Sequence, residues 1–321
     1  MNQNNSEKKT HFSPNNTTYT FLFIVILCLF TGCLLSIVVA WLQPIQKKSD
    51  VFDKNKELLI STKRLNYSNT FEIFYENNWI PAFFSKTEKI LKPFSKDVII
   101  KPAEKEDISL FFSLFIRPML VTIDGDIFSL EEKNITTQQF VNKYETNNYS
   151  DHLFPFYVLL KNDKKSHTIA NNQITNNLDM VEALIIPISG FGLWGPIFGF
   201  LSIENNGDTV LGSTWYQQTE TPGLGANITL PQWQKQFYGK KIFAVSNDGT
   251  QNFEQGQLGI DVIKGSVKSI LGNSPKSENS VDGISGATLT CNGVTAAFSS
   301  SLEPYRQLFI KMHKLNLTNQ K

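Results

Sequence analysis

The C-terminal part of this chain is built around the stretch Asp282-Gly283-Ile284-Ser285-Gly286-Ala287-Thr288-Leu289-Thr290, which is followed by Cys291-Asn292-Gly293-Val294. Its small residues leave the backbone bare, so N–H groups can approach a bulky anion, and its glycines can adopt the positive φ angles that an anion-cradling turn needs. From about Asn292 onward, apolar residues recur at helical spacing. The turn is therefore expected at a helix N-terminus, where free N–H groups and the macrodipole favour phosphate. The plain structural alternative is a helix cap that binds nothing.

Within this stretch, Ser285-Gly286-Ala287-Thr288 with the preceding Asp282-Gly283 resembles the flavinylation motif of the FMN-binding domains of bacterial respiratory complexes. In that family the last threonine carries FMN through a phosphoester bond, which a separate flavin transferase makes with FAD as donor. The resemblance implies a covalent FMN on Thr288. It also implies that the flavin lies among the neighbouring residues Ser285, Gly286, Ala287, Leu289 and Thr290. Asp282 would orient the turn or help the transferase to recognise it, unless it only forms the turn.

Two further blocks narrow the family. They are Phe191-Gly192-Leu193-Trp194-Gly195-Pro196-Ile197-Phe198-Gly199-Phe200 and Glu220-Thr221-Pro222-Gly223-Leu224-Gly225. Both resemble signatures of the C subunits of Na+-translocating NADH:quinone reductases, shared partly with the G subunits of Rnf complexes. The resemblance implies an FMN-carrying subunit that relays electrons from NADH towards quinone, coupled to sodium export. Its partners would be the other subunits of the pump. The family is also single-pass in the bacterial inner membrane, with the large domain in the periplasm.

The two blocks offer side chains for a flavin site. Leu193 and Trp194 could form an apolar slot, because an indole face packs on a flat ring; otherwise Trp194 is a core aromatic. Glu220 and Thr221 could bring a carboxylate and a hydroxyl to the flavin, or belong to an ordinary Pro-Gly turn. Gln218 stands where the family often has histidine, which weakens any proton-transfer role at that place. Cys291 stands where the family commonly has serine, and it should keep the helix start while capping it less well.

Length and composition exclude some classes of protein. The chain has 321 residues, a net charge of +1, 41% hydrophobic residues and 18% charged residues. This length predicts about two domains with a real core. Lysine and arginine are scattered, so there is no basic field that would bind nucleic acid. The histidines are dispersed without the spacing of metal ligands, and no metal site is expected.

The N-terminal region predicts a membrane anchor. Residues 1–20 are polar and read as a disordered tail, whereas 21–42 are free of charge and, at about 1.5 Å per residue, long enough to cross a hydrocarbon layer of roughly 30 Å. A cleaved signal peptide is the alternative, but its apolar core would be shorter and would end at small residues. More lysines follow the span than precede it, which by the positive-inside rule favours a cytoplasmic domain. We follow the family instead, because long domains translocate largely regardless of charge.

The fold predicted is α+β, with a single transmembrane helix followed by an extracytoplasmic domain that has an antiparallel sheet. The expected segments are a span at 21–43, a helical membrane-proximal linker at 44–69, an α+β subdomain at 70–178 that matches the family poorly, and the FMN-binding domain at 179–315. In the subdomain we expect a buried strand at 110–116, a hairpin at 119–128 that turns through Asp124-Gly125-Asp126, and loops at 138–151 and 160–177. In the last segment we expect strands at 180–188, 197–204, 209–216 and 243–245, then one helix from about 292 to 311. Asn206-Gly207 predicts a hairpin turn between the second and third of these strands.

Two classes of function remain open on the sequence. The first is the electron-carrying flavoprotein subunit, for which the Rnf G subunit is the nearest competitor. The second is a membrane-anchored binding or scaffold module that kept the fold without the flavin. A yellow chromophore that stays on the denatured chain would separate the two classes.

Overall fold

The computed structural model describes residues 17–95, 99–146 and 152–319. The remaining residues are 1–16, 96–98, 147–151 and 320–321. Most of the predicted N-terminal tail and the end of the predicted loop at 138–151 therefore lie outside the described residues. The chain divides into two units, Met1–Phe52 and Asp53–Lys321.

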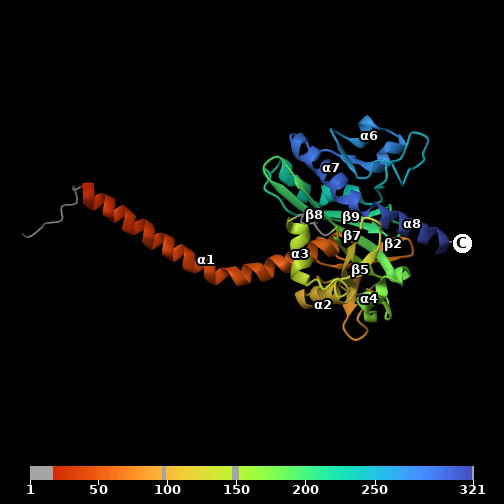
Figure 1. The fold of residues 1–321 in the computed structure, drawn as a ribbon, viewed down its shortest axis with the longest axis horizontal. Helices are drawn as coiled ribbons and strands as arrows, with labels where there is room; N and C mark the ends of the chain where they lie inside the picture. Colours follow the sequence, from red (N-terminus) through yellow and green to blue (C-terminus); the bar gives the residue numbers. More distant parts are fainter. Residues whose placement is uncertain (1–16, 96–98, 147–151, 320–321) are drawn as a thin grey trace, which may run out of the picture. The chain divides into compact units, whose positions relative to one another are not determined.

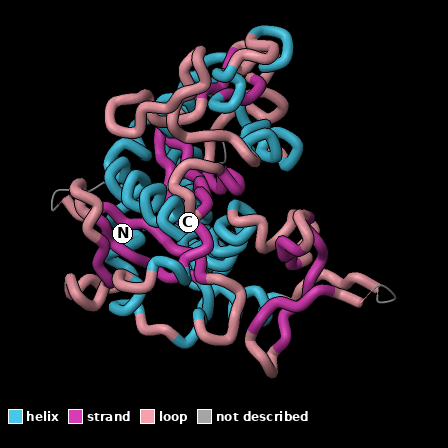
Figure 2. Tube along the Cα trace, turned by 90° about the vertical axis from the view of Figure 1, so that its right-hand side faces the viewer, coloured by secondary structure: helices cyan, strands magenta, loops and turns pink. Residues whose placement is uncertain are grey.

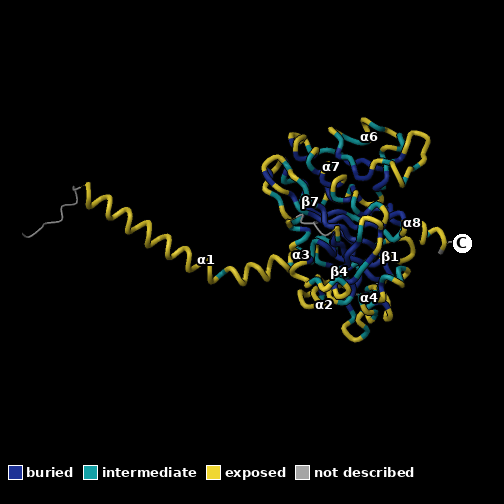
Figure 3. Tube along the Cα trace, viewed as in Figure 1, coloured by how far each residue is buried: buried dark blue, intermediate teal, exposed yellow. Residues whose placement is uncertain are grey.

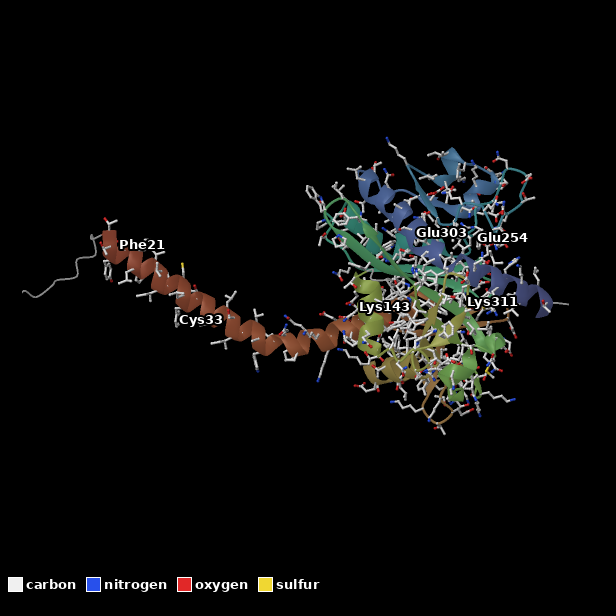
Figure 4. All side chains as sticks on the ribbon, in the orientation of Figure 1. Phe21, Cys33, Lys143, Glu254, Glu303 and Lys311 are labelled. Atoms are coloured by element: carbon white, nitrogen blue, oxygen red, sulfur yellow. The ribbon has the colours of Figure 1, made fainter. Side chains whose placement is uncertain are left out.

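The described residues of the first unit all belong to one long helix, α1 (Thr17–Ser61). Helix α1 begins within the predicted tail, runs through the predicted span and continues past Pro44. It ends at Ser61, before the end of the helical linker predicted at 44–69. Its most apolar window has a mean hydropathy of 3.0 and is not buried, so it is long and apolar enough to cross a membrane. Figure 3 shows this part as exposed, and Figure 4 shows Phe21 and Cys33 projecting from the helix surface.

The second unit is built on a six-stranded antiparallel sheet in the order β5-β4-β6-β7-β8-β9. Figure 1 labels its strands β5, β7, β8 and β9. Its strands are β4 (Ile116–Val121), β5 (Ile127–Ser129), β6 (Phe154–Leu160), β7 (Val181–Phe191), β8 (Pro196–Glu204) and β9 (Val210–Gln217). The predicted antiparallel sheet is confirmed, and so are the hairpin at 119–128 and the hairpin that turns at Asn206-Gly207. Strands β6 and β7 are neighbours in this sheet. The sheet therefore contains strands from both sides of the segment boundary that the sequence had indicated between residues 178 and 179.

Helices cover both faces of this sheet. On one face, α3 (Thr137–Thr146) brings Phe140 to a ring-centroid distance of 4.9 Å from Tyr157, and the end of α1 contacts β8 through a hydrogen bond between the Ser61 and Ser202 hydroxyls. On the other face, α7 (Thr288–Leu302) packs along β7, and its Phe298 lies edge-on to Trp215 of β9. These layers bury the apolar residues of the core on both sides of the sheet.

Smaller elements surround the main sheet. The strands β1 (Phe71–Tyr75), β2 (Asn78–Ser85) and β3 (Ile90–Pro93) form a second antiparallel sheet that packs on α2 (Lys105–Phe115). The short strands β10 (Asp261–Ile263) and β11 (Ser280–Asp282) pair in parallel immediately before α7. The helices α4 (Asn171–Ile174), α5 (Pro231–Gln234) and α6 (Val267–Ile270) are single turns. Figure 2 shows the loops that connect these elements.

Two predictions in the 70–178 segment were wrong. The apolar run at 110–116, expected as a strand, is mostly the end of α2, where Ile108, Phe111 and Phe115 are buried at helical spacing. A short apolar run fits either structure, and here the helical period extends back to residue 108. Residues 138–146 of the loop expected at 138–151 belong to α3, because Phe140 and Tyr144 are one turn apart and both buried.

Two predictions near the C-terminus also need correction. Residues 243–245 make only isolated bridges to Leu258 and Gln251 and form no strand. The single expected helix is divided into α7 and α8 (Arg306–Asn319) by a 3-10 turn that contains Pro304. Proline has no N–H to continue the helical ladder, which explains the interruption.

Candidate functional site

The glycine-rich motif forms the turn between β11 and α7. Gly286 has a φ of +75°, which confirms the need for glycine at this place. Ala287 is the N-cap of α7 and offers no side-chain cap, and Thr288 is the first helical residue. The first turn of α7 therefore presents N–H groups without a capping side chain, which is the arrangement that favours an anion.

The hydroxyls of the motif have different environments. Ser285 and Thr288 are both exposed, and neither hydroxyl has a hydrogen-bond partner among the described residues. Thr290 is only 1% exposed, and its hydroxyl donates to Oε2 of Glu220 at 2.5 Å. The motif thus has two hydroxyls at the surface and one that is engaged in the interior.

Asp282 holds the strand that leads into the motif. Its carboxylate accepts the N–H of Val267 at 2.7 Å, and its carbonyl oxygen accepts the indole N–H of Trp233 at 2.9 Å. Its own N–H donates to the side-chain oxygen of Gln236 at 2.9 Å. These contacts fit the interpretation in which Asp282 orients the turn, and they occupy one carboxylate oxygen.

Leu193 and Trp194 lie on the tight turn between β7 and β8. The turn is closed by a hydrogen bond from the N–H of Gly192 to the carbonyl of Gly195 at 2.8 Å. Trp194 is 67% exposed, and Leu193 is also exposed, so the alternative of a core tryptophan is excluded. The indole N–H of Trp194 donates to the hydroxyl of Thr221 at 3.2 Å, which links the two blocks found in the sequence.

Glu220 is buried at the centre of the site. Its Oε1 accepts the N–H of Trp194 at 2.9 Å, while Oε2 accepts the Thr290 hydroxyl. Burial by itself would raise the pKa of this carboxyl. The hydrogen bonds from Thr290 and from the backbone N–H groups of Trp194, Leu193 and Gly195 favour the charged form, and together they lower the pKa below its usual value. Glu220 is therefore ionised at neutral pH.

Leu224 is a site residue that the sequence reasoning missed. Its Cδ2 lies 3.0 Å from the position that a Cβ on Gly286 would occupy, so it borders the motif turn, and its side chain is 42% exposed. Leu289 is also exposed beside the motif. The sequence did place Leu224 in the Glu220–Gly225 block. The sequence could not identify it as a site residue, because an apolar leucine side chain is equally typical of a protein core. Exposed apolar side chains at Leu193, Trp194, Leu224 and Leu289 can cover a flat ring.

Cys291 supports the same turn from within. It is buried, and its Sγ accepts the N–H of Ile284 at 3.3 Å. Burial raises the pKa of this thiol. This hydrogen bond to Ile284 is a contact through which Cys291 could hold the start of the helix, as predicted. The thiol bonds the motif turn and does not cap the helix.

Comparisons with known proteins place the chain in one family. The model of the FMN-binding domain family matches residues 192–303. The chain is 47% identical over 308 residues to the C subunit of the Na(+)-translocating NADH-quinone reductase of Chlamydia pneumoniae, covering 96% of this chain and 95% of the relative. It is 47% identical to the corresponding protein of Chlamydia caviae, covering 97% of each chain. The crystal structure of the C subunit from Parabacteroides distasonis shares the fold, with a TM-score of 0.51, 22% identity and coverage of 84% of this chain and 96% of that chain.

Proposed function

The chain belongs to the family of C subunits of the Na+-translocating NADH:quinone reductases, and we propose that it carries its FMN through a phosphoester bond to Thr288. It is the membrane-anchored, FMN-binding electron-transfer subunit of that complex. In the complex it relays electrons from NADH towards quinone, coupled to sodium export. The other subunits of the reductase are therefore its partners.

The exposure of Thr288 carries the proposal. Its hydroxyl is at the surface, on the first residue of α7, without a hydrogen-bond partner among the described residues. The nearby Thr290 hydroxyl is buried and donates to Glu220, so it is not available to a transferase. Ser285 is exposed too, but it precedes the helix by three residues. Only a phosphate on Thr288 would lie directly at the helix N-terminus, where the macrodipole stabilises negative charge.

The surrounding side chains fit the ring of the cofactor. Leu193, Trp194, Leu224 and Leu289 offer exposed apolar surface, and Thr221 keeps the Trp194 indole in place by accepting its N–H. Bound FMN would supply the reversible uptake and release of electrons. The residues of the chain hold the ring and orient it.

Attachment needs a second protein in this proposal. A flavin transferase would use FAD as donor: the Thr288 oxygen forms the new bond to the FMN phosphorus, the pyrophosphate bond of FAD breaks, and AMP leaves while the hydroxyl proton is lost. Thr288 is exposed, which suits a large enzyme that must reach its hydroxyl.

Mass spectrometry of the tryptic peptide 277–306 tests the attachment. The protein is co-expressed with its flavin transferase, and we expect this peptide to gain the mass of FMN less one water, with fragment ions that place it on Thr288. Thr288→Ala should give a folded, membrane-inserted and colourless chain, whereas the matched control Ser285→Ala should keep the flavin. An unmodified peptide, or FMN on Ser285 or Thr290, refutes the assignment.

We further propose that the large domain lies in the periplasm. The lysines after the span favour the opposite orientation, but long domains translocate largely regardless of charge. Protease added to intact spheroplasts should therefore degrade the chain beyond about residue 50, while a cytoplasmic marker protein stays intact. Protection of the domain would reverse the orientation.

A further inference from the structure

We propose that Glu220 is a positioning residue that joins the segments of the flavin site into one rigid surface before FMN arrives. The inference rests on the proposed function, because this surface is needed only if FMN is attached at Thr288. Glu220 itself need not touch the flavin. Its role is to fix the turn that carries Trp194 against the start of the helix that carries Thr288.

Hydrogen bonds connect the carboxylate to both segments. Oε1 accepts the N–H of Trp194 at 2.9 Å, and the adjacent backbone N–H groups of Leu193 and Gly195 favour the charged form of the carboxylate. Oε2 accepts the hydroxyl of Thr290 at 2.5 Å, two residues after Thr288. One side chain thus binds both the β7–β8 turn and the first turn of α7.

The neighbouring glycines show that the position is specific. A Cβ on Gly192 would lie 2.5 Å from Oε1 of Glu220, and a Cβ on Gly225 would lie 2.6 Å from Oε2 and 2.5 Å from the Thr290 hydroxyl. Real Cβ contacts do not occur at such distances, so the carboxylate fills a slot that only bare backbone can border. Gly192 and Gly225, one from each sequence block, therefore make room for Glu220.

The electrostatics of the slot are unusual for a core. Glu220 is 5% exposed, and no lysine, arginine or histidine among the described residues lies within ion-pair distance. A buried charge without a cation is costly unless hydrogen bonds compensate it. Here N–H groups and a hydroxyl do so, and the positive end of α7 lies beside them. Hydrogen bonds to a charged acceptor are stronger than neutral ones, so the carboxylate holds the two turns more firmly than an amide would.

Two substitutions separate the charge from the contact. Glu220→Gln has nearly the same shape and keeps an oxygen for the backbone N–H groups, but it removes the charge. Glu220→Ala removes the connection altogether and leaves buried donors without an acceptor. Asp208→Asn is the matched control, because Asp208 is also buried and its carboxylate accepts the N–H of Phe243, away from the motif.

The first measurement is amide hydrogen exchange in the full-length chain purified in detergent. It is made in the Thr288→Ala background, so that no flavin contributes. Relative to the parent, Glu220→Ala should lower the protection of the Leu193, Trp194 and Gly195 amides by roughly tenfold or more, and Glu220→Gln by less. The parent's protection factors, corrected for intrinsic exchange, should fall as the pH drops through the lowered pKa of Glu220, and those of Glu220→Gln should not.

The second measurement is the rate at which the transferase modifies Thr288 in the full chain. Glu220→Ala should slow attachment roughly tenfold, Glu220→Gln should slow it less, and Asp208→Asn should leave both rate and protection unchanged. If Glu220→Ala does not fold, Glu220→Gln decides the question by its pH response. Unchanged protection in the Glu220 variants, or an equal loss in Asp208→Asn, overturns the inference. Failure of the proposed function would give a different result, namely an unmodified Thr288 in the wild-type chain.

Discussion

Gly293→Ala is expected to destabilise this subunit, although alanine is the better helix former. Gly293 lies in the second turn of α7, against the end of β7. A Cβ at this position would lie 3.1 Å from the carbonyl carbon of Phe191 and 3.2 Å from Cα of Gly192, and it would overlap the Phe191 carbonyl oxygen. All of these atoms are backbone, so no side chain can rotate away. The helix or the strand end must move.

Two effects of opposite sign decide how much Gly293→Ala changes the free energy of unfolding. Replacing glycine by alanine inside a helix stabilises it by about 1 kcal/mol. Overpacking costs typically about 1–3 kcal/mol, and a collision with backbone belongs in the upper part of that range. The net loss is therefore about 1–2 kcal/mol, which lowers Tm by roughly 2–8 °C for a domain of this size. Displacement of α7 should also move the start of the helix and slow the proposed attachment of FMN to Thr288.

Thermal unfolding of the full-length chain in detergent, followed by circular dichroism, measures this effect. Asn292→Ala is the matched control, because Asn292 is the adjacent residue on the exposed face of the same helix. It gains helix propensity without a collision, so its Tm should equal or exceed that of the wild type. A Gly293→Ala chain that melts at or above the wild-type Tm would refute the close-contact argument.

Two further outcomes are expected. Trp194→Ala should leave FMN attached but shift its absorption spectrum and slow its reduction in the complex, because the exposed indole would no longer cover the ring; an unchanged spectrum and rate would mean that Trp194 does not contact the flavin. Burial raises the pKa of Glu57 to about 7, so this group favours the folded state below the unfolded pKa of 4.5 and loses that contribution as the pH rises through about 7. Glu57→Gln should therefore match the wild type near pH 4.5 and be more stable at pH 8, by on the order of 2–3 kcal/mol in denaturant titrations; equal stability at pH 8 would contradict the burial argument.

Local patterns in the sequence predicted much of this fold. The alternating strands around Asn206-Gly207 and the turn at Asp124-Gly125-Asp126 were correct, because turn chemistry and period depend on neighbouring residues. The strand predicted at 110–116 was wrong, because a short apolar run fits both the two-residue period of a strand and the 3.6-residue period of a helix. The first part of the loop predicted at 138–151 is helix α3. The polar residues around Phe140 and Tyr144 obscured this helix, which tertiary packing stabilises.

The candidate site was predicted unevenly for the same reason. The motif around Thr288 is contiguous, so the turn, its glycine and the helix that follows could all be inferred. The bond from Thr290 to Glu220 joins residues 70 positions apart, and no local pattern reports it. Glu220 could be named from its block, but its burial, its charge and the segments it connects depend on how β7, β8 and α7 come together.

The exposure of the motif explains why a covalent bond would suit this site. Small-molecule sites usually enclose most of their ligand. Two of the larger cavities here, of about 580 and 590 Å³, are lined by residues such as Lys161 and Phe83, and neither includes the motif. A ring that rests on Trp194 and Leu224 would be open to solvent on one side and weakly held. The phosphoester proposed for Thr288 would retain the flavin without enclosing it, which leaves its edge accessible to the subunits that give and accept its electrons.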